Sequence, residues 1–213
     1  MCIGSDNEGL RDSTAMYDSP DSLRSEIAAA AARLIVDSGL DYGSAKLKAA
    51  RQLTGGAALP RGALPDSEEI DAALREHLEL FDPEHGARVA RRRAVAIRLM
   101  AELAEFEPYL TGAVWKGICA DHAPIHLQLF YDNAKEIEIR LLNGGLRFEV
   151  LTVPHFRQPQ DAVEALALDW LGEPVLLSLY DSVDLRGALK RGPDGAADRG
   201  DLAAVRALTA TPV

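Results

Sequence analysis

The chain has little cysteine and no long apolar run. Only two of its 213 residues are cysteine, Cys2 and Cys119, which excludes a disulfide framework and fits a reducing compartment. No stretch approaches the roughly 20 apolar residues that a membrane span requires. Residues 1–14 also lack the apolar segment of a signal peptide. We therefore expect a cytoplasmic protein that does not enter a membrane.

Basic residues are also in deficit, because 23 Lys and Arg face 33 Asp and Glu and give a net charge of −10. This balance disfavours broad nonspecific binding to nucleic acid, which is therefore not an expected partner. Apolar residues make up 47% of the chain, enough to form a sizeable core. The length allows one large or two small domains.

Helical patterns fill the chain up to about residue 108, because apolar residues recur there at spacings of three and four. Asp66 and Glu69 form a capping box for one of these helices. Another, expected at about 83–105, carries a group of arginines. We interpret them as a solvated face paired with acids, and an anion-binding or RNA-binding face is the alternative. They are Arg88, Arg91, Arg92, Arg93 and Arg98.

Strand patterns follow from residue 109. Three runs are typical of strands, at 125–131, 135–142 and 146–153, and the first two alternate in the period of a half-buried strand. The dipeptide Asn143–Gly144 predicts a tight hairpin between the last two runs. The first run would leave an open polar face beside the preceding glycine turn.

The remainder of the chain predicts a helix and then a buried strand. Asp161 and Glu164 form a second capping box, and the apolar residues after it share a helical face as far as Trp170. The nearly continuous apolar run 174–180 is typical of a strand that is buried on both faces. We therefore predict an α+β protein in three parts. These are a disordered tail (1–20), a helical region (21–108) and a domain with a mixed β-sheet and flanking helices (109–213).

A glycine turn with the sequence TGAVWKG, residues 111–117, precedes the first strand. From about Leu110 to Lys190 the sequence resembles the DNA polymerase beta-like nucleotidyltransferase superfamily, specifically its small bacterial members. The family motif has a hydrophobic residue and a glycine followed by glycine or serine. About ten residues later comes acid–hydrophobic–acid–hydrophobic, and a third acid lies on a later strand. Here Gly112–Ala113 occupies the glycine step, and residues 124–127 (Pro-Ile-His-Leu) occupy the acidic frame.

The resemblance implies a site without its metal ligands. In the family the acids hold two divalent cations that activate the attacking hydroxyl and stabilise the leaving phosphate. Mg²⁺ requires hard oxygen ligands, whereas Pro124 has no ligand atom and His126 offers a nitrogen suited to zinc or copper. We therefore expect a degenerate motif at Pro124 and His126, no catalytic residue and no cofactor.

A second acidic pair leaves an alternative open. Glu136 and Glu138 read acid–hydrophobic–acid, and a two-residue hairpin would place Glu138 opposite Glu149. The three glutamates could then hold Mg²⁺, or Arg140 and Arg147 could neutralise them on a solvated face, because like charges opposite each other are unfavourable.

Zinc is a further possibility, because four potential ligands lie within eight residues. Their spacing does not follow a regular structural zinc pattern, and Cys119 is equally suited to a small buried position. These potential ligands are Cys119, Asp121, His122 and His126.

The resemblance thus suggests a pseudoenzyme that binds a nucleotide or another anion, or acts as an interaction module. The residues expected at its ligand are Gly112, Ala113, Lys116 and Gly117. A protein partner would bind through the N-terminal helices. The alternative is an active nucleotidyltransferase with Mg²⁺ bound by Glu136, Glu138 and Glu149. It would transfer a nucleoside monophosphate to a protein, an RNA or a small molecule.

Overall fold

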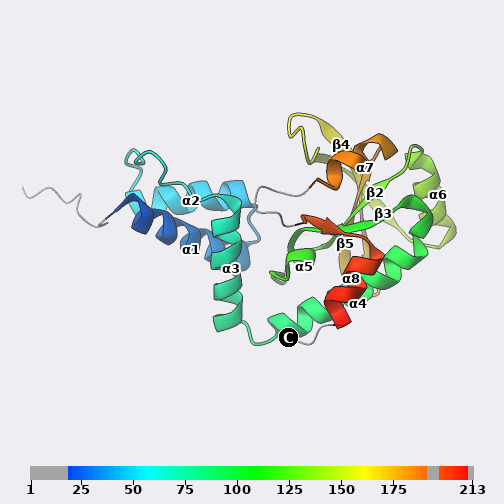
Figure 1. Ribbon diagram of the computed structural model, residues 1–213, viewed down its shortest axis with the longest axis horizontal. Coiled ribbons are helices and arrows are strands. Elements are labelled where there is room, and N and C mark those ends of the chain that lie inside the picture. Colours follow the sequence, from blue (N-terminus) through cyan, green and yellow to red (C-terminus); the bar gives the residue numbers. More distant parts are fainter. Residues whose placement is uncertain (1–18, 191–196, 211–213) are drawn as a thin grey trace, which may run out of the picture. The chain divides into compact units, whose positions relative to one another are not determined.

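A computed structural model of the chain describes residues 19–190 and 197–210. The predicted α+β fold is confirmed, because helices precede a six-stranded mixed sheet (Figure 1). The chain divides into two compact units, Met1–Leu74 and Arg75–Val213, with the boundary inside helix α3 (Ser67–Phe81). Within the described ranges, no helix is both long and apolar enough to cross a bilayer. Most of the predicted tail, including Cys2, lies outside the described residues.

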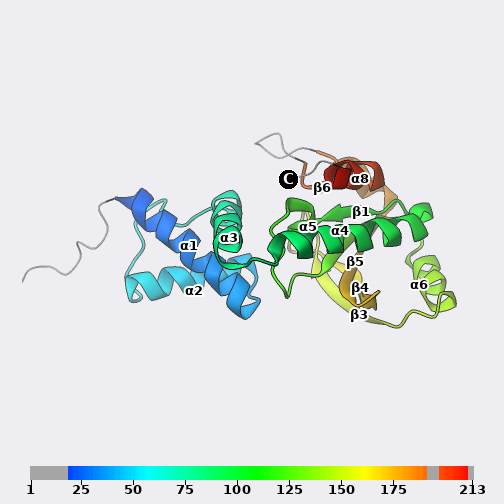
Figure 2. The ribbon, with the colours of Figure 1, turned by 90° about the horizontal axis from the view of Figure 1, so that it is seen from below.

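The first unit is built on two helices that lie side by side, α1 (Pro20–Ser38) and α2 (Tyr42–Thr54) (Figures 1 and 2). Each ends at a glycine in the left-handed conformation, which costs a glycine little. Alanines dominate the contact between the helices and permit their close approach. The predicted capping box of α3 is confirmed: the Glu69 N–H donates to Asp66 Oδ1 (2.9 Å), and the Asp66 N–H donates to Glu69 Oε2 (2.8 Å).

The second unit contains the sheet, with strand order β3-β4-β5-β2-β1-β6. Strands β2 and β5 are parallel, and the other neighbouring pairs are antiparallel. The strands are β1 (Tyr109–Thr111), β2 (Ile125–Phe130), β3 (Phe148–Pro154), β4 (Ala162–Trp170), β5 (Glu173–Tyr180) and β6 (Arg199–Gly200). The predicted strands at 125–131, 146–153 and 174–180 therefore correspond to β2, β3 and β5.

Helices cover the sheet on both faces. The main core lies on one face, where α4 (His85–Glu102) and α6 (Ala134–Asn143) join residues of β2 and β5. Helix α8 (Leu202–Ala210) adds Val205 to this core and contacts α4, β1 and β6. The long helix α4 crosses this face in Figure 2. On the opposite face, α7 (Leu185–Ala188) packs on Phe130 and Tyr180. Two short 3-10 segments, Ala104–Phe106 and Ser182–Asp184, and the short helix α5 (Gly112–Lys116) complete the unit.

The predicted strand at 135–142 is wrong, because this segment forms helix α6. Ile137 and Leu141 are buried, whereas Ile139 is 54% exposed. The buried pair is therefore four residues apart, as on one helix face, and the third apolar residue points away. The Asn143–Gly144 hairpin is wrong as well, because the Gly144 N–H bonds to the Arg140 carbonyl at the end of this helix.

The predicted helix that ends at Trp170 is also wrong, because the segment forms strand β4 between β3 and β5. Leu166 and Leu168 join the main core, while Val163 packs on the opposite face. A strand that is covered on both sides needs no alternation of apolar and polar residues. The helical spacing of its apolar residues was therefore fortuitous.

Candidate functional site

The glycine turn forms a short helix between two antiparallel strands. Strand β1 ends at Thr111, and Gly112 then adopts a φ of 69°, which a side chain would strain. Helix α5 follows and ends at Gly117, whose φ is 72°. Because Thr111 pairs with His126 of β2, a Cβ built on Gly112 would lie 3.8 Å from the His126 Cβ. His126 therefore lies directly beside the glycine step.

His126 is held as a neutral imidazole. Its Nε2 shares a hydrogen bond of 2.8 Å with the hydroxyl of Ser178 on β5. Burial lowers the pKa of His126 to about 4, and the charge of Arg199 adds to this effect. A serine next to a histidine can also form a nucleophile and its base. Ser178 is fully buried, however, so its hydroxyl cannot reach a substrate.

The polar face expected along β2 is closed rather than open. His126 is partly buried, and Gln128 and Phe130 are buried. Phe130 stacks against Tyr180 and meets Tyr109 edge-on, so aromatic rings cover the end of this face. The accessible chemistry is therefore confined to the neighbourhood of the glycine step.

An arginine from the far end of the chain completes this neighbourhood. Strand β6 pairs with β1 so that Arg199 lies opposite Thr111, and Thr111 in turn lies opposite His126. The three residues therefore form one row across three strands. The Thr111 hydroxyl donates to the Asp198 carbonyl (2.8 Å), and the Trp115 indole N–H donates to the Ala197 carbonyl (2.7 Å). These bonds hold β6 against the glycine turn.

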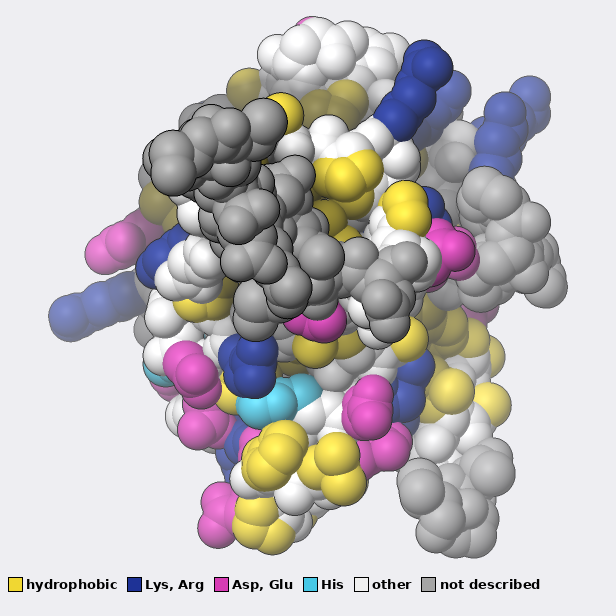
Figure 3. Space-filling view, turned by 90° about the vertical axis from the view of Figure 1, so that its left-hand side faces the viewer, with side chains coloured by type: hydrophobic (Ala, Val, Ile, Leu, Met, Phe, Trp, Pro, Cys, Tyr) yellow, Lys and Arg dark blue, Asp and Glu magenta, His cyan; other side chains and the backbone are white. Residues whose placement is uncertain are grey.

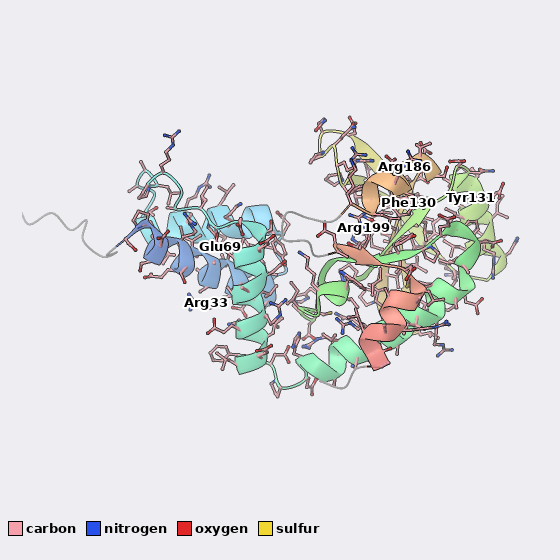
Figure 4. The ribbon with its side chains drawn as sticks, in the orientation of Figure 1. Arg33, Glu69, Phe130, Tyr131, Arg186 and Arg199 are labelled. Atoms are coloured by element: carbon pink, nitrogen blue, oxygen red, sulfur yellow. The ribbon has the colours of Figure 1, made fainter. Side chains whose placement is uncertain are left out.

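The Arg199 side chain is partly buried and has no carboxylate partner among the described residues. One Nη donates to the Gln128 side-chain oxygen, and the guanidinium lies 4.6 Å from the ring centroid of Phe156. Figure 4 shows it near the strand that carries Phe130. Its Nε is shielded from solvent and has no hydrogen-bond partner in the part of the chain that the structure describes. Burial lowers the pKa of Arg199, although Asp198 and Tyr180 oppose the effect.

The other residues predicted at the ligand do not share one cleft with Gly112. Lys116 is exposed at the end of α5. Gly117 lines a separate hollow of about 770 Å³ together with His85 and Arg93, and a Cβ on it would lie 3.1 Å from an Arg93 Nη. Ala113 lies within the short helix between the two glycines. The two ends of the turn therefore face different surroundings: Gly112 faces His126, and Gly117 faces the hollow beside Arg93.

The three glutamates proposed as metal ligands are separated by the helix that replaces the predicted strand. Glu136 and Glu138 lie on α6, whereas Glu149 lies on β3, opposite Ala167 of β4. Glu136 accepts hydrogen bonds from Tyr131 (2.7 Å) and Asn133 (2.8 Å), and Glu138 accepts one from Lys135 (2.5 Å). The predicted pairing of Glu138 with Glu149 is therefore wrong.

The side chains considered as zinc ligands contact other groups or are exposed. Cys119 is buried, and its sulfur accepts a hydrogen bond from Arg92 (2.8 Å). Asp121 forms an ion pair with Arg88 (2.7 Å), and His122 is exposed. In the described parts of the chain, no three His, Cys, Asp or Glu side chains lie close enough together to hold a metal ion.

The residues at the degenerate motif do not fit Mg²⁺. Pro124 is exposed and has no ligand atom, and the imidazole of His126 is engaged by Ser178. An imidazole and a hydroxyl are not the hard anionic oxygen set that Mg²⁺ prefers. Pro124 and His126 therefore offer no fitting ligand set for Mg²⁺.

Three of the α4 arginines pair with acids as predicted, namely Arg88, Arg91 and Arg92, but Arg88 and Arg92 are buried rather than solvated. Arg93 instead donates to the carbonyls of Val114 and Trp115. Arg92 is 4% exposed and bonds to Glu173, which is 5% exposed, at 2.7 Å. It also donates to the carbonyls of Ala120, Asp121 and Ala123. Arg88 is 5% exposed and pairs with Asp82 and Asp121. These bonds fix the loop that leads into His126.

Sequence reasoning missed the role of Arg199, and no local pattern could have revealed it. The nearest pattern in the sequence is Asp201, which caps α8 by accepting from the Ala204 N–H (2.8 Å), and it does not involve the Arg199 side chain. Only the pairing of β6 with β1 brings Arg199 to the glycine turn.

The surface and the comparisons give no further indication of a ligand. On the described part of the face in Figure 3, basic and acidic side chains are interspersed and form no broad basic patch. A search of protein-family models, curated proteins and solved structures found no match for this chain.

Proposed function

We propose that the second unit is a nucleotidyltransferase-like module that has lost catalysis and binds an anionic ligand, with a nucleotide as the first candidate. The observation that carries this proposal is the state of His126. It occupies the place of a metal-binding acid beside Gly112, yet it is neutral and bonded to a buried serine. The proposal is also supported by the position of the glycine step, which lies between two paired strands.

The loss of catalysis follows from electrostatics. Stabilisation of developing charge is usually the largest contribution to catalysis, and in two-metal phosphoryl transfer the bound cations supply much of it. Neither Pro124 nor His126 can supply the anionic oxygens that hold such cations. A site of this kind can still bind a ligand, because binding requires only complementary charge and shape.

The first experiment tests catalysis. The full chain is incubated with each of the four ribonucleoside triphosphates, labelled on the α-phosphate, in the presence of Mg²⁺ or Mn²⁺. We expect no transfer of label to the protein, to added RNA or to small acceptors. Robust transfer that disappears in Glu138→Ala and persists in the exposed control Glu102→Ala would contradict the loss of catalysis.

The second experiment tests binding. Calorimetric titration of the same chain with each nucleotide should give a saturable signal. Silence for every nucleotide would remove the binding function. A scaffold role would then remain, with the helices of the first unit as the surface for a protein partner.

A further inference from the structure

We propose that Arg199 takes the place of the metal ions and binds a phosphate-type oxyanion of the ligand directly. This inference rests on the proposed binding function and specifies the chemistry of the same site. It predicts that the ligand binds without any divalent cation.

First, the guanidinium of Arg199 has no ion-pair partner among the described residues. Charged side chains that lose contact with water are normally paired, because desolvation of an unpaired ion is costly. Among the described residues, the Arg199 side chain donates to the neutral Gln128 and lies over the ring of Phe156, and no carboxylate forms an ion pair with it, although the charge of Asp198 raises its pKa. A guanidinium offers five N–H donors in a planar fork that matches carboxylate and phosphate oxygens. An oxyanion that contacts the guanidinium would therefore balance its charge.

The second argument is the position of Arg199. It lies in one row with Thr111 and His126, so its charge is next to the place where the family's acids would hold their cations. His126 is neutral and does not quench that charge. An aspartate at position 126 would instead pair with Arg199 and compete with an incoming anion. A neutral residue at position 126 therefore leaves the charge of Arg199 available to an anion.

The third argument is that the position of Arg199 is fixed. Gly200 packs under the Trp115 ring, where a Cβ would come within 2.3 Å of a ring carbon. Together with the bonds from Thr111 and Trp115 to the carbonyls of Asp198 and Ala197, just before β6, this contact holds Arg199 beside the glycine step. A guanidinium that is positioned before binding loses less conformational entropy when an anion arrives.

The experiment measures binding to the full chain by calorimetry in excess EDTA. The probes are ATP, inorganic pyrophosphate and adenosine, which separate a nucleotide from a free phosphate and from a base. We expect ATP to bind without metal and adenosine to bind much more weakly. Pyrophosphate that binds as tightly as ATP would identify a phosphate site rather than a nucleotide site, and both results support the role of Arg199.

The variants test the arginine itself. Arg199→Gln should weaken ATP binding by about tenfold to a hundredfold, because a charged hydrogen bond is lost. Arg199→Lys should lose less, since it keeps the charge without the fork. Arg206→Gln, which changes an exposed arginine of α8, should have no effect. His126→Asp should also weaken binding, whereas a restored metal site would strengthen it in Mg²⁺.

The outcomes separate this inference from the proposed function. ATP binding that is unchanged in both Arg199 variants, or that requires Mg²⁺, would overturn the inference and leave the binding function in place. Silence of the unaltered chain for all three probes in EDTA would overturn the inference, whereas the binding function falls only if the chain is also silent for every nucleotide in the titration described above. Circular dichroism of each variant checks folding, and Arg199→Lys provides the comparison if Arg199→Gln does not fold.

Discussion

Arg92 and Arg199 lie in the same unit and differ in what surrounds their charge. Arg92 is a buried residue of α4, and its donors reach Glu173, the Cys119 sulfur and three loop carbonyls. Arg199 is partly buried beside β1, where a neutral amide and an aromatic ring contact it and no carboxylate of the described residues forms an ion pair with it. Arg92 bonds to a carboxylate and to several other acceptors, whereas Arg199 bonds to one neutral amide and leaves its Nε without a partner among the described residues. Burial alone therefore does not separate these two arginines. The number and charge of their partners do, and they are the reason for proposing an anionic ligand at Arg199.

The largest loss of stability is expected when Arg92 loses its partner Glu173. Glu173→Ala leaves Arg92 buried without a counter-charge, and breaking such a pair costs about 3–5 kcal/mol of unfolding free energy. Urea unfolding followed by tryptophan fluorescence measures this loss, because both tryptophans, Trp115 and Trp170, lie in the second unit.

A matched control removes an exposed partner. The Asp121 side chain is 78% exposed in its ion pair with Arg88, so Asp121→Ala should cost less than about 1 kcal/mol. Equal losses in Glu173→Ala and Asp121→Ala would mean that burial does not set the strength of these pairs.

The next effect concerns the pH dependence of stability. The unfolded chain protonates His126 near pH 6.5, whereas the folded state resists protonation until about pH 4. The folded state should therefore lose stability as the pH falls from 6.5 to 4, by at most about 3 kcal/mol, because the unfolded state binds the proton first.

This contribution can be isolated with His126→Gln, which removes the titrating group at similar size. We expect the difference in unfolding free energy between the variant and the unaltered chain to change across that pH range and to stay flat above pH 7. NMR titration of the imidazole provides a direct check. A His126 pKa near 6.5 would show that the ring is solvated.

The sequence predicted the elements whose burial follows from local pattern. The capping box of Asp66 and Glu69 acts within one turn, and the apolar run of β5 is central to the sheet, so both were confirmed. Segments that satisfied two periodicities at once were assigned wrongly. Ile137 and Leu141 fit a helix as well as a strand, and only packing on the main core decides between them.

The candidate site was predictable only in part, for a related reason. The glycine step and His126 are neighbours in a local hairpin-like unit, so spacing brings them together. Arg199 is more than 70 residues away and joins the site through a two-residue strand. The charge balance of a site depends on such distant contacts, and sequence spacing does not encode them.

A smaller effect is expected where Gly200 positions Arg199. In Gly200→Ala the new methyl group would meet the Trp115 ring, so we expect a loss of about 1–3 kcal/mol from overpacking and a shift of β6. Gly86→Ala is the control, because its Cβ meets nothing within 4 Å on α4. It should stabilise the unit by about 0.5–1 kcal/mol through helix propensity. Urea unfolding of both variants gives the comparison, and a neutral Gly200→Ala would mean that β6 is not held by this contact.

The smallest effect on stability is expected at Arg199 itself, and it defines the contrast with Arg92. Arg199→Gln removes a partly desolvated charge that lacks a carboxylate, so the desolvation cost it relieves offsets the lost bond to Gln128. We expect the unfolding free energy to change by less than about 1 kcal/mol in the absence of ligand. In the presence of a bound oxyanion, the unaltered chain should gain stability that the variant lacks, because only a ligand that binds the folded state stabilises it. A loss in Arg199→Gln as large as that in Glu173→Ala would show that Arg199 is a structural residue.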